Sequence, residues 1–135
     1  MASAGGRSDA RERALALLYE AEMKGTSGTE VVAALPVPPD PYAAALVEGV
    51  EARRAEVDAL LRRFSRSWPL ERMPAIDRAV LRLATWELLD RPDVPTAVVI
   101  DEAVELAKRF STEDSGRFVN GMLSSIAGEV RRARS

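Results

Sequence analysis

The stretch Pro74-Ala-Ile-Asp-Arg-Ala-Val-Leu-Arg-Leu-Ala-Thr-Trp-Glu87 decides the fold that this sequence predicts. Pro74 can open a helix, because proline at the first helical position gives up no intrahelical hydrogen bond, and Pro92 marks an end near Asp90. Apolar side chains lie on nearly every side of this helix. The remaining positions form a narrow polar strip of Asp77, Arg78, Arg82 and Thr85. A helix that is apolar almost all round is buried, so we expect residues 74–90 to form the central helix.

Other helices are predicted on both sides of residues 74–90. Capping residues, apolar residues at helical spacing and proline breaks place them at about residues 8–24, 28–35, 41–66, 97–110 and 114–132, with a short helical turn within 68–74. Asp40-Pro41 is the clearest start signal, because it puts an N-cap acid before a proline. Phe110 is expected on the buried stripe of its helix, and Ser111 or Asp114 is expected to cap the last one. The prediction is an all-α protein of about seven helices.

The size and composition of the chain fit one soluble helical domain. Its 135 residues are 47% hydrophobic but only 5% aromatic, and 30% are charged, as expected for interlocked helices with hydrated outer faces. No apolar run approaches the roughly 18 residues that span a bilayer, and residues 1–6 lack the apolar stretch of a secretory signal. We therefore expect a cytoplasmic protein without a membrane partner.

The absence of cysteine and histidine excludes most catalytic chemistry. Without these residues there is no thiolate or imidazole to act in catalysis or to bind zinc. Asp101, Glu102 and Glu105 are better explained as a solvated surface run than as a metal site, since an oxygen-only site needs more converging ligands. We expect no enzyme activity and no cofactor. The formal net charge of −2 means that any nucleic-acid binding must come from a local patch.

One segment contains charged and aromatic residues that helix packing alone does not require. The run Ser111-Thr-Glu-Asp-Ser-Gly-Arg-Phe-Val-Asn-Gly121 starts the last predicted helix. Burial explains Val119, but it does not require Asp114, Arg117 and Phe118 together. This run, followed by Met122-Leu123, resembles the C-terminal signature of the NusB family of transcription antitermination factors.

Three further stretches resemble the same family, in the same order along the chain. They are residues 10–19, 76–87 and 93–108, with prolines between them. The resemblance implies two stacked helical subdomains, which we place at residues 7–66 and 67–135 after a flexible tail at 1–6. It also implies an RNA surface formed by the first helix and the start of the last helix.

The resemblance implies a non-catalytic function in transcription. A NusB-like factor would bind a U-rich, boxA-type single-stranded RNA cooperatively with the small-subunit ribosomal protein NusE. The pair would join RNA polymerase in the antitermination complex at ribosomal RNA operons. The candidate RNA-binding residues are Arg7, Arg11, Arg13, Tyr19, Asp114, Ser115, Arg117, Phe118 and Asn120. Asp77 is the candidate for the ribosomal-protein interface, and an acid that stabilises its own helix N-terminus is an equal alternative.

The residues alone leave other interpretations open. Arg7, Arg11 and Arg13 are interrupted by Ser8, Asp9 and Glu12 and also fit a solvated helix face. Tyr19 and Phe118 also fit a core, and Asp114 also fits a cap. The rival function is a helical protein-interaction module that binds no RNA and uses the segment Trp68–Met73, or an exposed Ala/Val stripe, to bind a partner helix. A homodimer is a further alternative to a complex with the ribosomal protein.

Overall fold

The computed structural model describes residues 6–132, and this part of the chain folds entirely into helices and connecting turns. The α-helices are α1 (Gly6–Lys24), α2 (Gly28–Ala33), α3 (Pro41–Ala52), α4 (Arg54–Phe64), α5 (Ala75–Asp90), α6 (Thr96–Phe110) and α7 (Glu113–Val130), with a 3₁₀ turn, η1 (Leu70–Arg72). No strand occurs in residues 6–132, so the all-α prediction is confirmed. The prediction of a tail at 1–6 falls mostly on residues outside those described, and Gly6 is already the first residue of α1.

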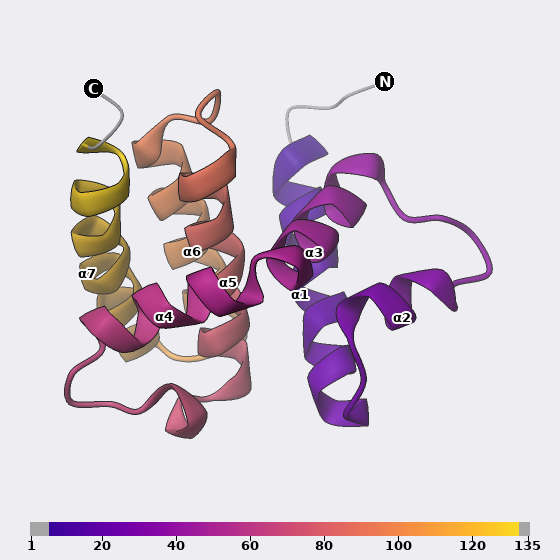
Figure 1. Ribbon diagram of the computed structural model, residues 1–135, viewed down its shortest axis with the longest axis horizontal. Coiled ribbons are helices and arrows are strands. Elements are labelled where there is room, and N and C mark those ends of the chain that lie inside the picture. The colour runs from indigo at the N-terminus through magenta and orange to yellow at the C-terminus, as the bar shows by residue number, and fades with distance from the viewer. Residues whose placement is uncertain (1–5, 133–135) are drawn as a thin grey trace.

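Helix α5 is the centre of the structure, as its sequence predicts. It packs against α1, α3, α4, α6 and α7. Figure 1 shows α1–α3 on one side of the molecule and α5–α7 on the other, with α4 leading from the first group to the second. Most residues of α5 are buried, including Val80, Leu81, Leu83 and Leu88.

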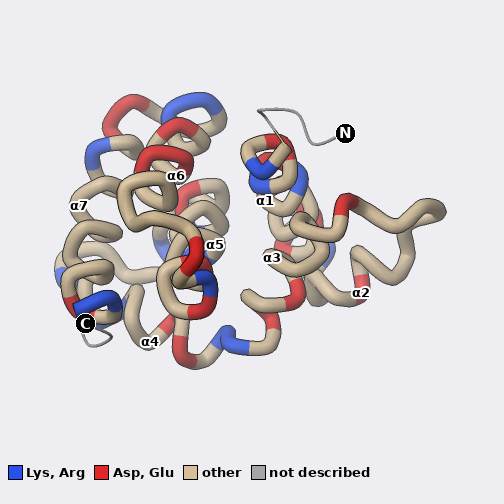
Figure 2. The backbone as a smooth tube through the Cα atoms, turned by 90° about the horizontal axis from the view of Figure 1, so that it is seen from above, with Lys and Arg blue, Asp and Glu red and all other residues tan. Residues whose placement is uncertain are grey.

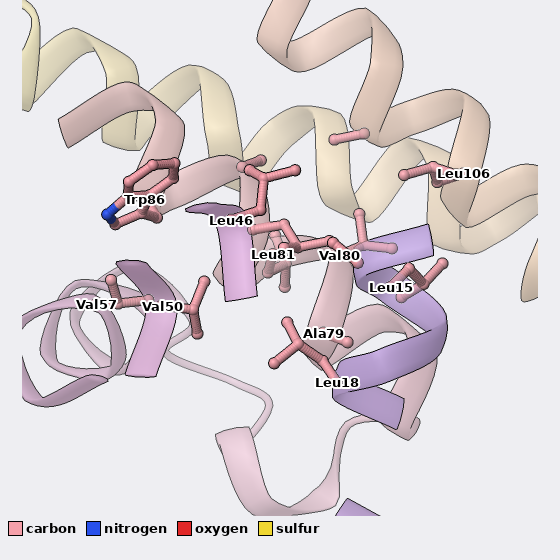
Figure 3. Packing of buried hydrophobic residues seen from close by; sticks show 14 of the residues in the cluster. Leu15, Leu18, Leu46, Val50, Val57, Ala79, Val80, Leu81, Trp86 and Leu106 are labelled. Carbon is pink, nitrogen blue, oxygen red and sulfur yellow. The ribbon is translucent and has the colours of Figure 1, made fainter. Parts of the chain in front are cut away.

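The buried apolar residues form a continuous core across both groups of helices. Figure 3 shows Leu46 of α3 and Leu15 of α1 beside Val80 and Leu81 of α5. Trp86, also from α5, belongs to this core and lies directly against the backbone of α3 at Gly49. In the apolar core, the contact between the two groups of helices is therefore made by α5 side chains.

The predicted single helix at 41–66 is wrong, because it breaks at Arg53. Arg53 has φ −114° and ψ 25°, and α4 starts one residue later. The Arg53 side chain donates hydrogen bonds to Glu56 and Asp90. Helix α3 packs against α1, α2 and α5, whereas α4 packs against α5, α7 and η1. The two helices share α5 and otherwise pack against different elements, and the subdomain boundary at residue 66 stays a prediction.

Local capping explains where several helices begin and end. The Asp40 carboxylate accepts hydrogen bonds from the amides of Tyr42 and Ala43, as predicted for an N-cap before Pro41. Gly25 has φ 67°, the left-handed conformation that ends a helix at little cost for glycine. Thr112 caps α7 through the Ser115 amide, which corrects the expectation of Ser111 or Asp114.

Within residues 6–132, no helix combines the length and apolarity needed to cross a bilayer.

Candidate RNA interface

The exposed side of α1 presents three of the predicted RNA-binding residues. The Arg7 guanidinium lies 4.5 Å from the centroid of the Tyr42 ring and 3.6 Å from the Asp93 carboxylate, and its side chain is 48% exposed. Arg13 is exposed and has no ion pair within the described residues. Tyr19 is 39% exposed. All three side chains can therefore reach a ligand from solvent.

Arg11, by contrast, is buried, which corrects its assignment to an exposed cationic surface. Its Nε and Nη2 atoms lie 2.9 Å from the two carboxylate oxygens of Glu87, and its Nη1 lies 3.2 Å from Glu102 Oε1. Arg11 is 4% exposed and Glu87 is 1% exposed. The Tyr42 hydroxyl also donates to Glu87, at 2.5 Å. Arg11 therefore joins α1 to α5 and α6 inside the protein and has no free guanidinium for a phosphate.

Tyr42 provides a prediction about pH. Burial, together with its hydrogen bond to the negative Glu87, raises the pKa of Tyr42 to about 12. Because this folded-state pKa lies above the ordinary value near 10, the unfolded chain loses the proton first, and stability falls as pH rises from about 10 to about 12. The Tyr42→Phe variant should lose this component of the alkaline decline. Urea unfolding from pH 8 to 12 measures it, and an unchanged decline in the variant would contradict the assignment.

The first turn of α7 is anchored to α5 by a buried group of polar side chains. The Ser115 hydroxyl donates to Asp77 Oδ2 at 2.7 Å and lies 2.9 Å from the Thr112 hydroxyl. Asp77 is fully buried and Ser115 is 5% exposed. Both side chains are turned into the protein here, and their assignments to RNA and to the partner protein stay predictions. Their role in this structure is to fix the start of α7 against the start of α5.

The outer face of the same turn carries the exposed candidates. Arg117 and Asp114 form an ion pair in which both side chains are more than four-fifths exposed. Asn120 follows one turn later and is exposed. Together with α6 they border an open groove of about 410 Å³. Its lining consists of Asp101, Val104, Glu105, Lys108, Glu113, Gly116, Arg117 and Asn120.

The surroundings of Phe118 fit both interpretations that the sequence left open, a core residue and an RNA-binding residue. Its ring is partly buried and makes an edge contact with Trp68, with centroids 4.9 Å apart and an angle of 62° between the planes. Trp68 precedes η1 and is itself partly exposed. Phe118 thus packs on one side and keeps part of its ring accessible on the other.

Phe110 is an exposed aromatic residue that the sequence predicted to be buried. It is the last residue of α6 and is 42% exposed. The Arg109 guanidinium lies 4.8 Å from its ring centroid, and the same group lies 3.1 Å from Glu12 Oε1 on α1. Helical spacing placed Phe110 on the core face, but the helix end extends past the core. In the sequence, the basic residue Arg109 directly before Phe110 at the end of the helix was the signal that this ring could be exposed.

The ion pair between Arg109 and Glu12 joins α1 to the end of α6, directly before the predicted RNA segment at the start of α7. Glu12 and Tyr19 are seven residues apart on α1, so they share one helix face about 10 Å apart along the axis. The end of α6, with Phe110, lies at the Glu12 end of that face.

Acidic and basic positions are interspersed along most of the chain (Figure 2), so a local ligand site is expected instead of one global electrostatic field. No cluster in residues 6–132 has three potential metal-ligating side chains.

Comparison with known proteins gives the same family as the sequence motifs. Residues 8–128 match the NusB family. The transcription antitermination protein NusB of Sorangium cellulosum is 50% identical over 134 residues, covering 95% of this chain and 96% of that protein. The NusB structure of T. maritima superposes with a TM-score of 0.83 at 36% identity, covering 91% of each chain. A crystal structure of the antitermination factors NusB and NusE with double-stranded RNA superposes with a TM-score of 0.77 at 28% identity, covering 90% of this chain and 96% of that one. The chain belongs to the NusB family.

Proposed function

We propose that this protein is a transcription antitermination factor that binds RNA together with the small-subunit ribosomal protein NusE and catalyses no reaction. The relative from Sorangium cellulosum is a transcription antitermination protein, and the related complex contains NusB, NusE and RNA. The observation that carries the proposal is the exposure of two aromatic residues, Tyr19 on α1 and Phe110 at the end of α6, on helices that the ion pair between Arg109 and Glu12 joins.

The side chains on this surface favour unpaired RNA. Bases of a single strand can leave the stack and lie on aromatic rings, while cations contact the phosphates. Tyr19, Phe110 and Phe118 supply the rings, and Arg13 supplies a cation that has no ion pair in residues 6–132. A U-rich boxA-type element is the proposed ligand. Arg7 forms an ion pair with Asp93, and Arg117 forms one with Asp114. Because these carboxylates compete with phosphates, RNA binding by this chain alone is expected to be weak and to depend on the ribosomal protein.

The proposal extends to the assembly in which such a factor would act. The protein and NusE together would join RNA polymerase during transcription of ribosomal RNA operons, in the cytoplasm. Asp77 would contribute indirectly, by holding the first turn of α7 through Ser115. A homodimer is the alternative oligomeric state, and sedimentation of the protein with and without NusE distinguishes the two.

Phe118→Ala tests the RNA site. Loss of a stacking ring should weaken RNA binding by about 1–3 kcal/mol. We would measure this by fluorescence anisotropy with a U-rich boxA-type RNA, in the presence and absence of NusE. Phe118→Leu is the matched control for packing, because it keeps an apolar contact for Trp68 but removes the aromatic face. It should retain more thermal stability than the alanine variant and show a similar loss of RNA affinity.

Two results would contradict this proposal in different ways. Normal RNA affinity in a folded Phe118→Ala protein with a much lower melting temperature would show that the ring only packs. Absence of RNA binding by the parent protein, with single-stranded or duplex RNA and with or without NusE, would favour the protein-interaction module instead.

A further inference from the structure

A second surface, outside the predicted RNA site, has an excess of positive charge. We name it the α4–η1 basic patch, and its members are Arg62, Arg63, Arg66 and Arg72. All four side chains are exposed. Two carboxylates oppose them: Glu71 lies 2.7 Å from Arg62 Nη2, and Glu129 lies 2.7 Å from Arg63 Nη2. Within residues 6–132, Arg66 and Arg72 form no ion pair.

This local charge is opposite in sign to that of the whole protein. The chain has a formal net charge of −2, so four arginines facing two carboxylates form a basic region on an acidic protein. Exposed ion pairs contribute only about 0–1 kcal/mol to stability. Arg66 and Arg72, which form no ion pair in residues 6–132, are therefore not explained by a contribution to the fold. A polyanion would neutralise them.

Aromatic rings are interleaved with these arginines. Phe64 lies under the Arg63 guanidinium, 5.1 Å from ring centroid to guanidinium carbon. Trp68 stands between Arg66 and Arg72 in the sequence, is partly exposed and touches the ring of Phe118. Cations alternating with accessible rings are the combination that binds a single strand without strict sequence preference.

We propose that single-stranded RNA flanking the recognised element continues from Phe118 across Trp68 onto the α4–η1 basic patch. This inference rests on the proposed function, because it assumes that Phe118 marks the RNA path. The patch contacts phosphates and contributes affinity without reading the sequence. It makes the protein prefer an RNA that extends beyond the recognised element to one that stops there.

The test compares two RNAs on the parent protein and on the double variant Arg66→Gln/Arg72→Gln. One RNA contains only the U-rich element, and the other adds unstructured nucleotides at both ends. The parent should bind the extended RNA more tightly and with a steeper dependence on salt. If each arginine contacts one phosphate, the double variant should flatten the slope of log K against log salt by about 1.4 for the extended RNA, at about 0.7 per phosphate. Binding of the short RNA should not change.

A charge-matched control distinguishes direct phosphate contacts of Arg66 and Arg72 from a general effect of the protein's charge. Lys24→Gln/Arg54→Gln removes two cations outside the patch, at the end of α1 and the start of α4, and should leave both RNAs bound as by the parent. An equal loss in control and test variants would overturn the inference, because bulk charge would explain it. An unchanged slope in the test variant would also overturn it.

The remaining outcomes identify which proposal fails. If the parent binds the short RNA but gains nothing from the extension, the patch is not part of the RNA path and the proposed function stands. If the parent binds neither RNA, the proposed function fails. If the double variant loses affinity for NusE in the absence of RNA while both RNAs bind normally, the patch is a protein interface and the inference is wrong.

Discussion

Glu87→Ala is expected to lower the free energy of unfolding by about 3–5 kcal/mol, because it leaves the charge of Arg11 buried without its main partner. The Arg11 guanidinium donates to both oxygens of Glu87, and both side chains are almost completely buried. The Tyr42 hydroxyl would lose its acceptor as well. Urea denaturation at neutral pH measures the loss. We expect the same range for Arg11→Ala, which leaves the Glu87 carboxylate unpaired.

Two controls define this result. The double variant Arg11→Met/Glu87→Met replaces both charges with apolar groups of similar length and should be much less destabilised than either alanine variant, because no buried charge remains. Glu20→Ala breaks the exposed pair with Lys24 and should cost less than about 1 kcal/mol. A loss below 1 kcal/mol in Glu87→Ala would show that water reaches Arg11, and Arg11 would again be available to RNA.

Gly49→Ala is expected to destabilise the protein by about 1–3 kcal/mol through overpacking. A Cβ atom at this position would overlap the Cε2, Nε1 and Cζ2 atoms of Trp86. The indole is rigid and belongs to the core, so it cannot move aside at low cost. Alanine has a higher helix propensity than glycine, by about 0.8–1.0 kcal/mol. The overlap should outweigh this gain, and the melting temperature should fall.

Gly121→Ala is the matched control within the same protein. Gly121 lies in the interior of α7 and is exposed, and a Cβ there would have no atom within 4 Å apart from its chain neighbours and the backbone of its own helix. The same chemical change should therefore stabilise the protein by up to about 1 kcal/mol. If Gly49→Ala proves neutral or stabilising by comparison, Trp86 does not pack against α3 in the way described.

The sequence by itself determined the helices and most of their ends. Asp40-Pro41 starts α3 and Gly25 ends α1 through interactions within a few residues. The nearly continuous apolar surface of α5 also determined that this helix is central. The family motifs, read in order, determined the family, which residues 8–128 match. These features depend on neighbouring residues or on a periodic pattern, so they can be recognised without knowing the fold.

The break at Arg53 was decided by tertiary structure. No proline or glycine stands there, and the apolar residues keep helical spacing through the break. The side chain of Arg53 contacts Asp90, 37 residues away. Both helices contact α5, but only α3 packs against α1 and α2 and only α4 packs against α7 and η1, so the chain changes direction between them.

Only the tertiary structure decided which charged and aromatic residues face solvent. Arg11 looks like an exposed cation in the sequence, but its partner Glu87 is 76 residues away. Asp77 meets Ser115 across 38 residues, and both are removed from the surface. Phe110 has the spacing of a core residue and lies exposed because α6 extends past the core. Burial of a polar group depends on whether a distant group satisfies its charge or hydrogen bonds, and a single sequence does not contain that pairing.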